Sequence, residues 1–100
     1  MALEIRENRG LFEISGRVTS QNLNALKVYF DSLLESNDTI VISIENVIEM
    51  DSSAALFFEK LYREVASNNK VLSIVGKQNI DISKIMSDTG TDYILSSDRI

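Results

Sequence analysis

Apolar residues recur along this chain at two different spacings, and each spacing predicts a type of secondary structure. Over residues 23–34 and 54–65 they fall three or four positions apart, which is the period of an amphipathic helix. A shorter stripe over residues 80–87 predicts a third helix that begins near Asp81. The apolar positions of the two long stripes are Leu23, Leu26, Phe30, Leu33, Leu34 and Ala54, Phe57, Phe58, Leu61, Tyr62, Val65.

The first eighteen residues predict a β-hairpin. Residues 3–6 and 11–15 mix apolar and polar positions, and the turn formers Asn8 and Gly10 lie between them. Gly16 follows the second run and is expected to end that strand.

Two later runs, residues 39–44 and 71–75, are rich in β-branched residues and predict buried strands. The first run is so nearly continuous in apolar character that it predicts a strand covered on both faces. Residues 93–95 predict a short closing strand. Strands that alternate with helices imply parallel pairing through right-handed crossovers. We therefore expect one α/β domain over residues 1–100, with a mixed sheet of four to five strands in the order β-β-α-β-α-β-α(-β).

Composition narrows the chemistry of this domain. The 100 residues include no His and no Cys, which excludes a Ser-His-Asp triad and a soft metal site, so we expect no cofactor, no metal and no enzyme. A net charge of −5 disfavours nucleic acid and anionic membrane surfaces as partners and favours a protein. No apolar run is long enough to span a bilayer, and no signal peptide is visible, so a cytoplasmic protein is expected. The sequence leaves open whether the domain is a monomer or a weak dimer.

Two helix starts hold the polar residues that could have a function. Thr19 or Ser20 is the expected N-cap of the first helix. The turn Asp51-Ser52-Ser53 stands between a strand and the second helix. Asp and Ser are common N-caps, and the turn alone favours that reading. The alternative is that a serine displayed at the positive end of a helix accepts a phosphate.

Four segments, taken in order, resemble the STAS domain, and within that family the bacterial anti-sigma factor antagonists. The Asp-Ser-Ser turn is the most specific part of the resemblance. The chain departs from the family at Ala54, where Gly is usual, and at Thr19, in a region where an acidic residue is common. The matching segments are FEISGRVTSQNLNAL (12–26), TIVISIENVIEMDSSAAL (39–56), KVLSIVG (70–76) and ISKIMSDTGTDYIL (82–95).

The resemblance implies a switch. The unphosphorylated domain would bind an anti-sigma factor that is also a serine kinase, and so release a sigma factor. Phosphorylation of Ser52 would block binding, and a serine phosphatase would restore it. Ser53 would cap the helix or act as a secondary phosphate acceptor. The partner-binding residues implied are Asp51, Ser52, Ser53, Ala54, Arg17, Thr19 and Ser20.

Two other functions remain open at this stage. Some STAS domains are not phosphorylated and act as constitutive subunits of a transporter ATPase or a signalling complex. An enzyme with Ser52 as nucleophile is a weaker alternative, because no Ser-x-x-Lys spacing surrounds that residue.

Overall fold

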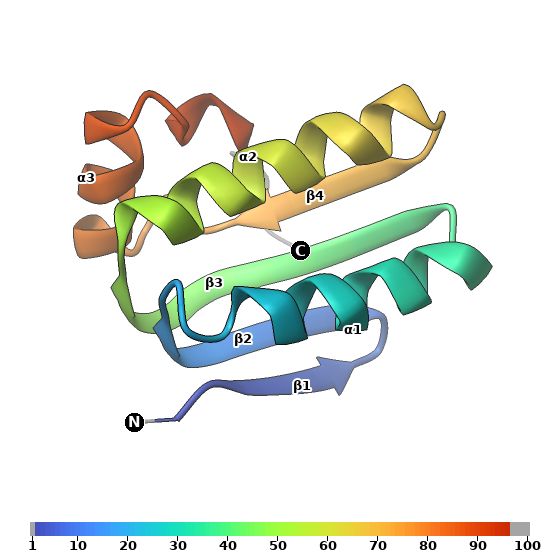
Figure 1. The fold of residues 1–100 in the computed structure, drawn as a ribbon, viewed down its shortest axis with the longest axis horizontal. Helices are drawn as coiled ribbons and strands as arrows, with labels where there is room; N and C mark the ends of the chain where they lie inside the picture. The colour runs from blue at the N-terminus through green and yellow to red at the C-terminus, as the bar shows by residue number, and fades with distance from the viewer. Residues whose placement is uncertain (1, 97–100) are drawn as a thin grey trace.

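The computed structural model describes residues 2–96, which form one five-stranded sheet and its helices (Figure 1). This arrangement confirms the predicted α/β class and the predicted order of elements. The elements are β1 (Glu4–Asn8), β2 (Leu11–Val18), α1 (Leu23–Ser36), β3 (Thr39–Met50), α2 (Ser52–Ser67), β4 (Val71–Val75), α3 (Ile80–Asp88), a 3-10 turn (Asp92–Ile94) and β5 (Leu95–Ser96).

The strands lie in the sheet in the same order as in the chain. β1 and β2 pair antiparallel, and the pairs from β2 to β5 are parallel. The hairpin turn has Arg9 at φ 55° and Gly10 at φ 85°. Positive φ at both central residues is the signature of the type I′ turn, whose twist matches that of the flanking strands.

Gly16 does not end β2, so that prediction is wrong. The strand continues to Val18, and its pairing register with β3 shifts just after Gly16. Gly16 has φ 89°, and a Cβ there would collide with the backbone oxygen of Ala2. A glycine is therefore required at this position because the backbone is left-handed and another segment passes directly against it.

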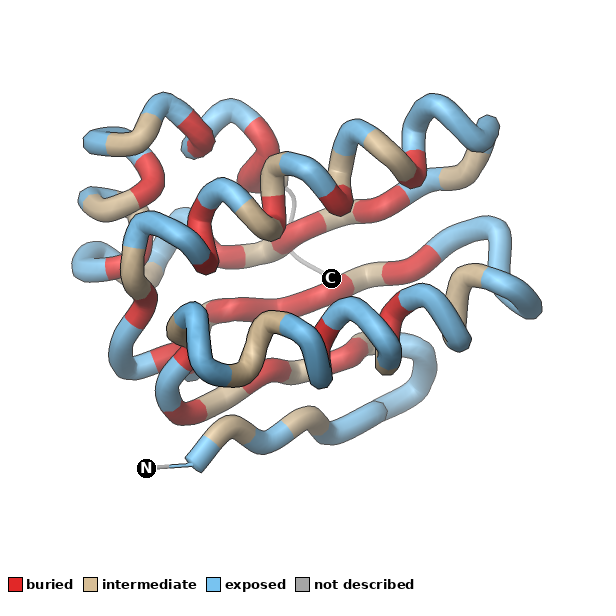
Figure 2. The backbone as a smooth tube through the Cα atoms, viewed as in Figure 1, coloured by how far each residue is buried: buried red, intermediate tan, exposed pale blue. Residues whose placement is uncertain are grey.

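Helices α1 and α2 lie on one face of the sheet (Figure 1). The topology explains this, because each right-handed crossover advances to the next strand in the same direction and so places its helix on the same side. In β3, Ile40, Ile42 and Ile44 are almost fully buried. Figure 2 shows buried positions recurring along the strands behind the helices. Thr39 and Val41 point the other way and are more exposed.

The prediction that residues 39–44 are covered on both faces is consequently wrong. No helix between residues 2 and 96 covers the second face of β3. The misleading feature was Val41, which made the run look continuous. The alternation of Ile with Thr, Val and Ser was already that of a strand with one strongly buried face.

Asn79 joins the middle of β3, just after its pairing with β4 ends at Ser43, to the start of α3. Its side-chain oxygen accepts from the N–H of Ile82, 3.4 Å away, and caps the helix. Its amide nitrogen lies within hydrogen-bonding distance of three backbone oxygens, at 3.2 Å from Ile44, 3.0 Å from Glu45 and 2.8 Å from Val47. One side chain thereby satisfies backbone groups where β3 leaves the regular ladder.

We predict that Asn79→Ala lowers the free energy of unfolding by about 2 kcal/mol, since it removes a helix cap and leaves partly buried carbonyls without a donor. Urea unfolding measures this loss. Asn24→Ala, on the exposed side of α1, is the matched control and should change stability by less than about 0.5 kcal/mol. Equal stabilities of the two variants would contradict the role assigned to Asn79.

Candidate functional site

The carboxylate of Asp51 connects two segments that are far apart in sequence. Its Oδ1 accepts a hydrogen bond from the N–H of Ala54 at 2.9 Å, which makes Asp51 the N-cap of α2. Its Oδ2 accepts from the N–H of Ser20 at 3.0 Å, in the loop between β2 and α1. The backbone N–H of Asp51 also donates to the oxygen of Val18, at 3.4 Å. Asp51 therefore holds the start of α2 and the β2–α1 loop in one arrangement. The alternative cap, Ser53, does not have this role.

The β2–α1 loop is also held by its own side chains. Asn22 immediately precedes α1, so the prediction of Thr19 or Ser20 as the cap residue is wrong. Asn22 accepts from the N–H of Thr19 at 3.0 Å and donates to the oxygen of Arg17 at 2.9 Å. The amide thus stabilises the loop conformation and leaves the first turn of α1 without a side-chain cap.

Ser52 and Ser53 are the first two residues of α2, and both are exposed. Within residues 2–96, nothing hydrogen-bonds to either hydroxyl. Ala54 and Ala55 directly below them are fully buried. The two serine hydroxyls therefore face solvent at the positive end of a well-anchored helix. Ala54, by contrast, is fully buried and exposes no side-chain surface to a partner. Its methyl group packs in the core beneath the two serines.

A surface depression of about 510 Å³ lies beside this helix start. Four of the predicted partner-binding residues line it: Arg17, Thr19, Ser20 and Asp51. Sequence reasoning missed Glu49, which also lines the depression and pairs with Arg17 at 3.1 Å between Nε and Oε1.

Arg17 and Glu49 are directly paired in the β2–β3 register, which brings their side chains together. Their spacing in the sequence does not predict this contact. Since both side chains are more than half exposed, the ion pair adds little stability. Its charges cancel, so the carboxylate of Asp51 leaves the depression with a net negative charge.

Three large apolar side chains near this end of the sheet are exposed, and sequence reasoning missed them as well. Leu56 is 51% exposed and lies one helical turn after Ser52, on the same side of α2. Ile48 and Ile80 are 53% and 79% exposed. They follow Val47 and Asn79, which are hydrogen-bonded to each other. Leu56 could have been noticed, because it stands outside the apolar stripe of its helix.

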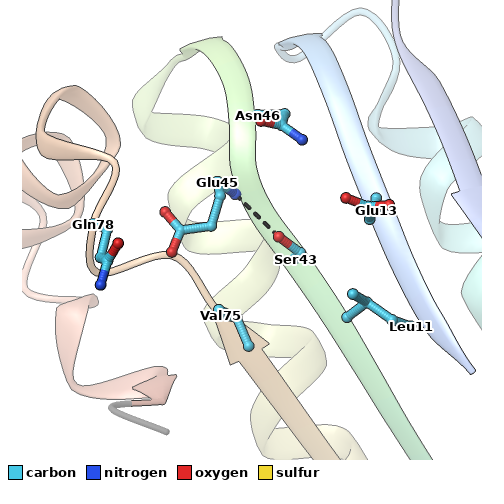
Figure 3. A pocket seen from close by; sticks show the side chains of 7 residues that line it. All are labelled: Leu11, Glu13, Ser43, Glu45, Asn46, Val75 and Gln78. Carbon is cyan, nitrogen blue, oxygen red and sulfur yellow. Dashed lines mark hydrogen bonds between the residues drawn. The ribbon is translucent and has the colours of Figure 1, made fainter. Parts of the chain in front are cut away.

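A second depression, of about 480 Å³, lies on the face of the sheet that the helices leave open (Figure 3). Glu13 and Glu45 flank Ser43, whose Oγ accepts from the N–H of Glu45 at 3.3 Å. Across residues 2–96, no group of three or more His, Cys, Asp or Glu could hold a metal ion. No helix in that range is long and apolar enough to cross a bilayer.

The fold and this site define a class of protein: a small α/β domain that presents two serines at the start of the helix that follows its central strand. The model of the STAS domain family matches residues 1–95, and the chain belongs to that family. The resemblance noted from the sequence is thereby confirmed. No curated protein sequence matches the chain.

Solved structures of similar fold agree with this assignment. The anti-sigma factor antagonist SpoIIAA in its unphosphorylated form has a TM-score of 0.72 at 15% identity, covering 95% of this chain and 86% of that one. An uncharacterised protein from the DUF3478 family with a SpoIIAA-like fold, from Shewanella loihica PV-4, has a TM-score of 0.53 at 18% identity. That match covers 90% of this chain and 78% of the other. At such identities the likeness shows a shared fold.

We predict that Asp51→Ala destabilises the domain by about 1–2 kcal/mol, because it removes the α2 cap together with the hydrogen bond to Ser20. Asp51→Asn keeps one side-chain acceptor and can still cap the helix, so it should recover most of the loss. Thermal unfolding measures both effects. The amide of Ser20 should exchange faster with solvent in both variants, and an unchanged exchange rate in Asp51→Ala would contradict the role assigned to Oδ2.

Proposed function

We propose that this chain is a regulatory binding domain of the anti-sigma factor antagonist type, switched by reversible phosphorylation of Ser52. The unphosphorylated domain binds a cytoplasmic anti-sigma factor that is also a serine kinase, and a serine phosphatase reverses the modification. The observation that carries the proposal is the exposed hydroxyl of Ser52, unbonded within residues 2–96, at the start of a helix whose cap is a different residue.

Phosphorylation at this position is compatible with the fold. Asp51 makes the cap and the loop contact with its own two oxygens, so the Ser52 hydroxyl is free to be modified. A phosphate adds about −1.5 to −2 charges. The helix dipole favours negative charge at this end, typically by about 0.3–1 kcal/mol. The added group therefore changes the surface and leaves α2 in place.

The same phosphate changes what the surface can bind. It adds charge next to Asp51, at an edge where the charge of Arg17 is already matched by Glu49. It also lies one helical turn from the exposed Leu56, so a partner that packs on Leu56 would have to desolvate a dianion. Repulsion and desolvation act in the same direction and weaken the complex.

Ser53 and Ala54 have subordinate roles in this proposal. Ser53 is exposed and serves as the secondary phosphate acceptor. Ala54 stands where the family usually has Gly, and its buried methyl keeps the helix start small without taking up partner surface. Arg17, Thr19 and Ser20 form the second segment of the contact surface, which Asp51 holds beside α2.

We predict that Ser52→Asp weakens binding to the cognate kinase by about tenfold or more, equivalent to about 1.4 kcal/mol. Ser52→Ala should bind like the unsubstituted protein and resist modification. Isothermal titration calorimetry with the purified kinase measures both affinities. Ser53→Asp is the matched control, with the same charge one residue further along, and should have a smaller effect.

The thermal midpoint of Ser52→Asp should remain at or slightly above that of the unsubstituted protein, since Asp is favourable in the first turn of a helix. A loss of binding with unchanged stability would support a surface effect. Equal binding by Ser52→Asp and Ser52→Ala would instead indicate the constitutive alternative, a STAS subunit of a transporter ATPase or a signalling complex.

The modification itself gives a separate prediction. Protein isolated from its own host under growth and stress conditions should include a fraction one phosphate heavier, which fragmentation maps to Ser52. That fraction should change with the condition, because a switch must be set by a signal. Intact-mass spectrometry measures it, and uniformly unmodified protein in every condition would overturn the phosphorylation step.

A further inference from the structure

β1 is an edge strand with one side unused. It pairs only with β2, and no strand between residues 2 and 96 lies along its other side (Figure 1). Such an edge presents free backbone N–H and C=O groups that can pair with another strand. At the other end of the sheet β5 has two residues, whereas β1 has five. Within residues 2–96, β1 is therefore the longer of the two edges.

The hairpin geometry shows which backbone groups face outward. In a two-residue type I′ hairpin, the residues flanking the turn, here Asn8 and Leu11, form a hydrogen-bonded pair. Hydrogen-bonded and non-hydrogen-bonded pairs then alternate along the ladder. Glu4 and Arg6 consequently direct their N–H and C=O groups at β2. Ile5 and Glu7 direct theirs away from it, to the free edge.

The charges on this strand are complementary to a reversed copy of themselves. Glu4 and Arg6 flank Ile5, and all three side chains are at least partly exposed. In an antiparallel pair of two β1 strands centred on Ile5, Glu4 of each copy lies opposite Arg6 of the other. Both would be non-hydrogen-bonded pairs, in which facing side chains are closest. Opposite charges in such pairs stabilise a sheet, and like charges oppose it.

We propose that two copies of this chain associate through β1, antiparallel and centred on Ile5, to form one continuous sheet. The two Ile5 residues exchange backbone hydrogen bonds, and Glu7 pairs with Leu3 of the second copy on each side, giving about six such bonds. The Glu4–Arg6 contact within one chain, 3.4 Å between Nε and Oε1, is exposed and exchanges for the contact between copies.

Charged residues on an edge strand often prevent pairing with another strand. Whether Glu4 and Arg6 oppose or favour the pairing therefore depends on the signs of the charges that face each other. Two like charges flanking Ile5 would repel their copies in this register, whereas one of each sign attracts. The net charge of −5 on each copy opposes close approach. The dimer is consequently weak and depends on concentration. The proposed pairing uses backbone groups of residues 3–7 and no group of Ser52, so this inference does not depend on the proposed switch, although Leu3 also lines the depression beside Asp51.

Charge swaps at the two positions test the register directly. Sedimentation of the unsubstituted protein should show a concentration-dependent monomer–dimer equilibrium. Glu4→Arg alone or Arg6→Glu alone places like charges opposite each other and should weaken association by roughly tenfold or more. The double variant restores opposite charges and should recover the dimer. An equal mixture of the two single variants should also associate, because Arg in one copy then faces Glu in the other.

Thermal unfolding of each variant checks that the monomer remains folded. Hydrogen exchange on the unsubstituted protein gives a test that needs no substitution, since the amides of Ile5 and Glu7 should become protected as concentration rises. The amide of Val28, on the exposed side of α1, is the reference and should not change. A protein that stays monomeric into the millimolar range would overturn the proposal. A dimer that both single swaps leave intact would overturn it too.

Discussion

The parallel pairing of β2 with β3 is the contact on which the site depends. Because the carboxyl ends of parallel strands meet at the same edge of a sheet, this pairing brings the loop after Val18 beside the turn at Asp51. The two segments are more than thirty residues apart in sequence. The carboxylate of Asp51 then connects them, so one residue both starts a helix and positions a loop.

This arrangement separates the anchoring of the helix from the group that could be modified. A serine that caps a helix would lose its hydrogen bond, or change it, when phosphorylated. Here the cap is a carboxylate, and the neighbouring hydroxyl of Ser52 has no structural duty among residues 2–96. A phosphate placed there would change the charge of the surface by about −1.5 to −2 at little cost to the stability of the fold.

Most of the fold could be read from the sequence, because its signals are local. The apolar stripes located α1 and α2. The β-branched runs located β4 and the first half of β3, which the structure extends from the predicted end at residue 44 to Met50. The errors occurred where a local pattern had two meanings. Gly16 looked like a strand end but permits a close approach of backbone at a left-handed position. Val41 made the apolar run of β3 look continuous, so the strand was expected to be buried on both faces although helices cover only one.

The sequence by itself determined the order of the elements, the Asp-Ser-Ser turn at a helix start and the residue types available for chemistry, because each of these depends on near neighbours in the chain. Only the tertiary structure decided which residue caps α2 and that the N–H of Ser20 donates a hydrogen bond to Asp51. It also decided that Glu49 forms an ion pair with Arg17 and that Ala54 is buried. These facts depend on the register between strands and on one shared direction of crossover. Both are set by packing over the whole sheet, and no short stretch of sequence encodes them.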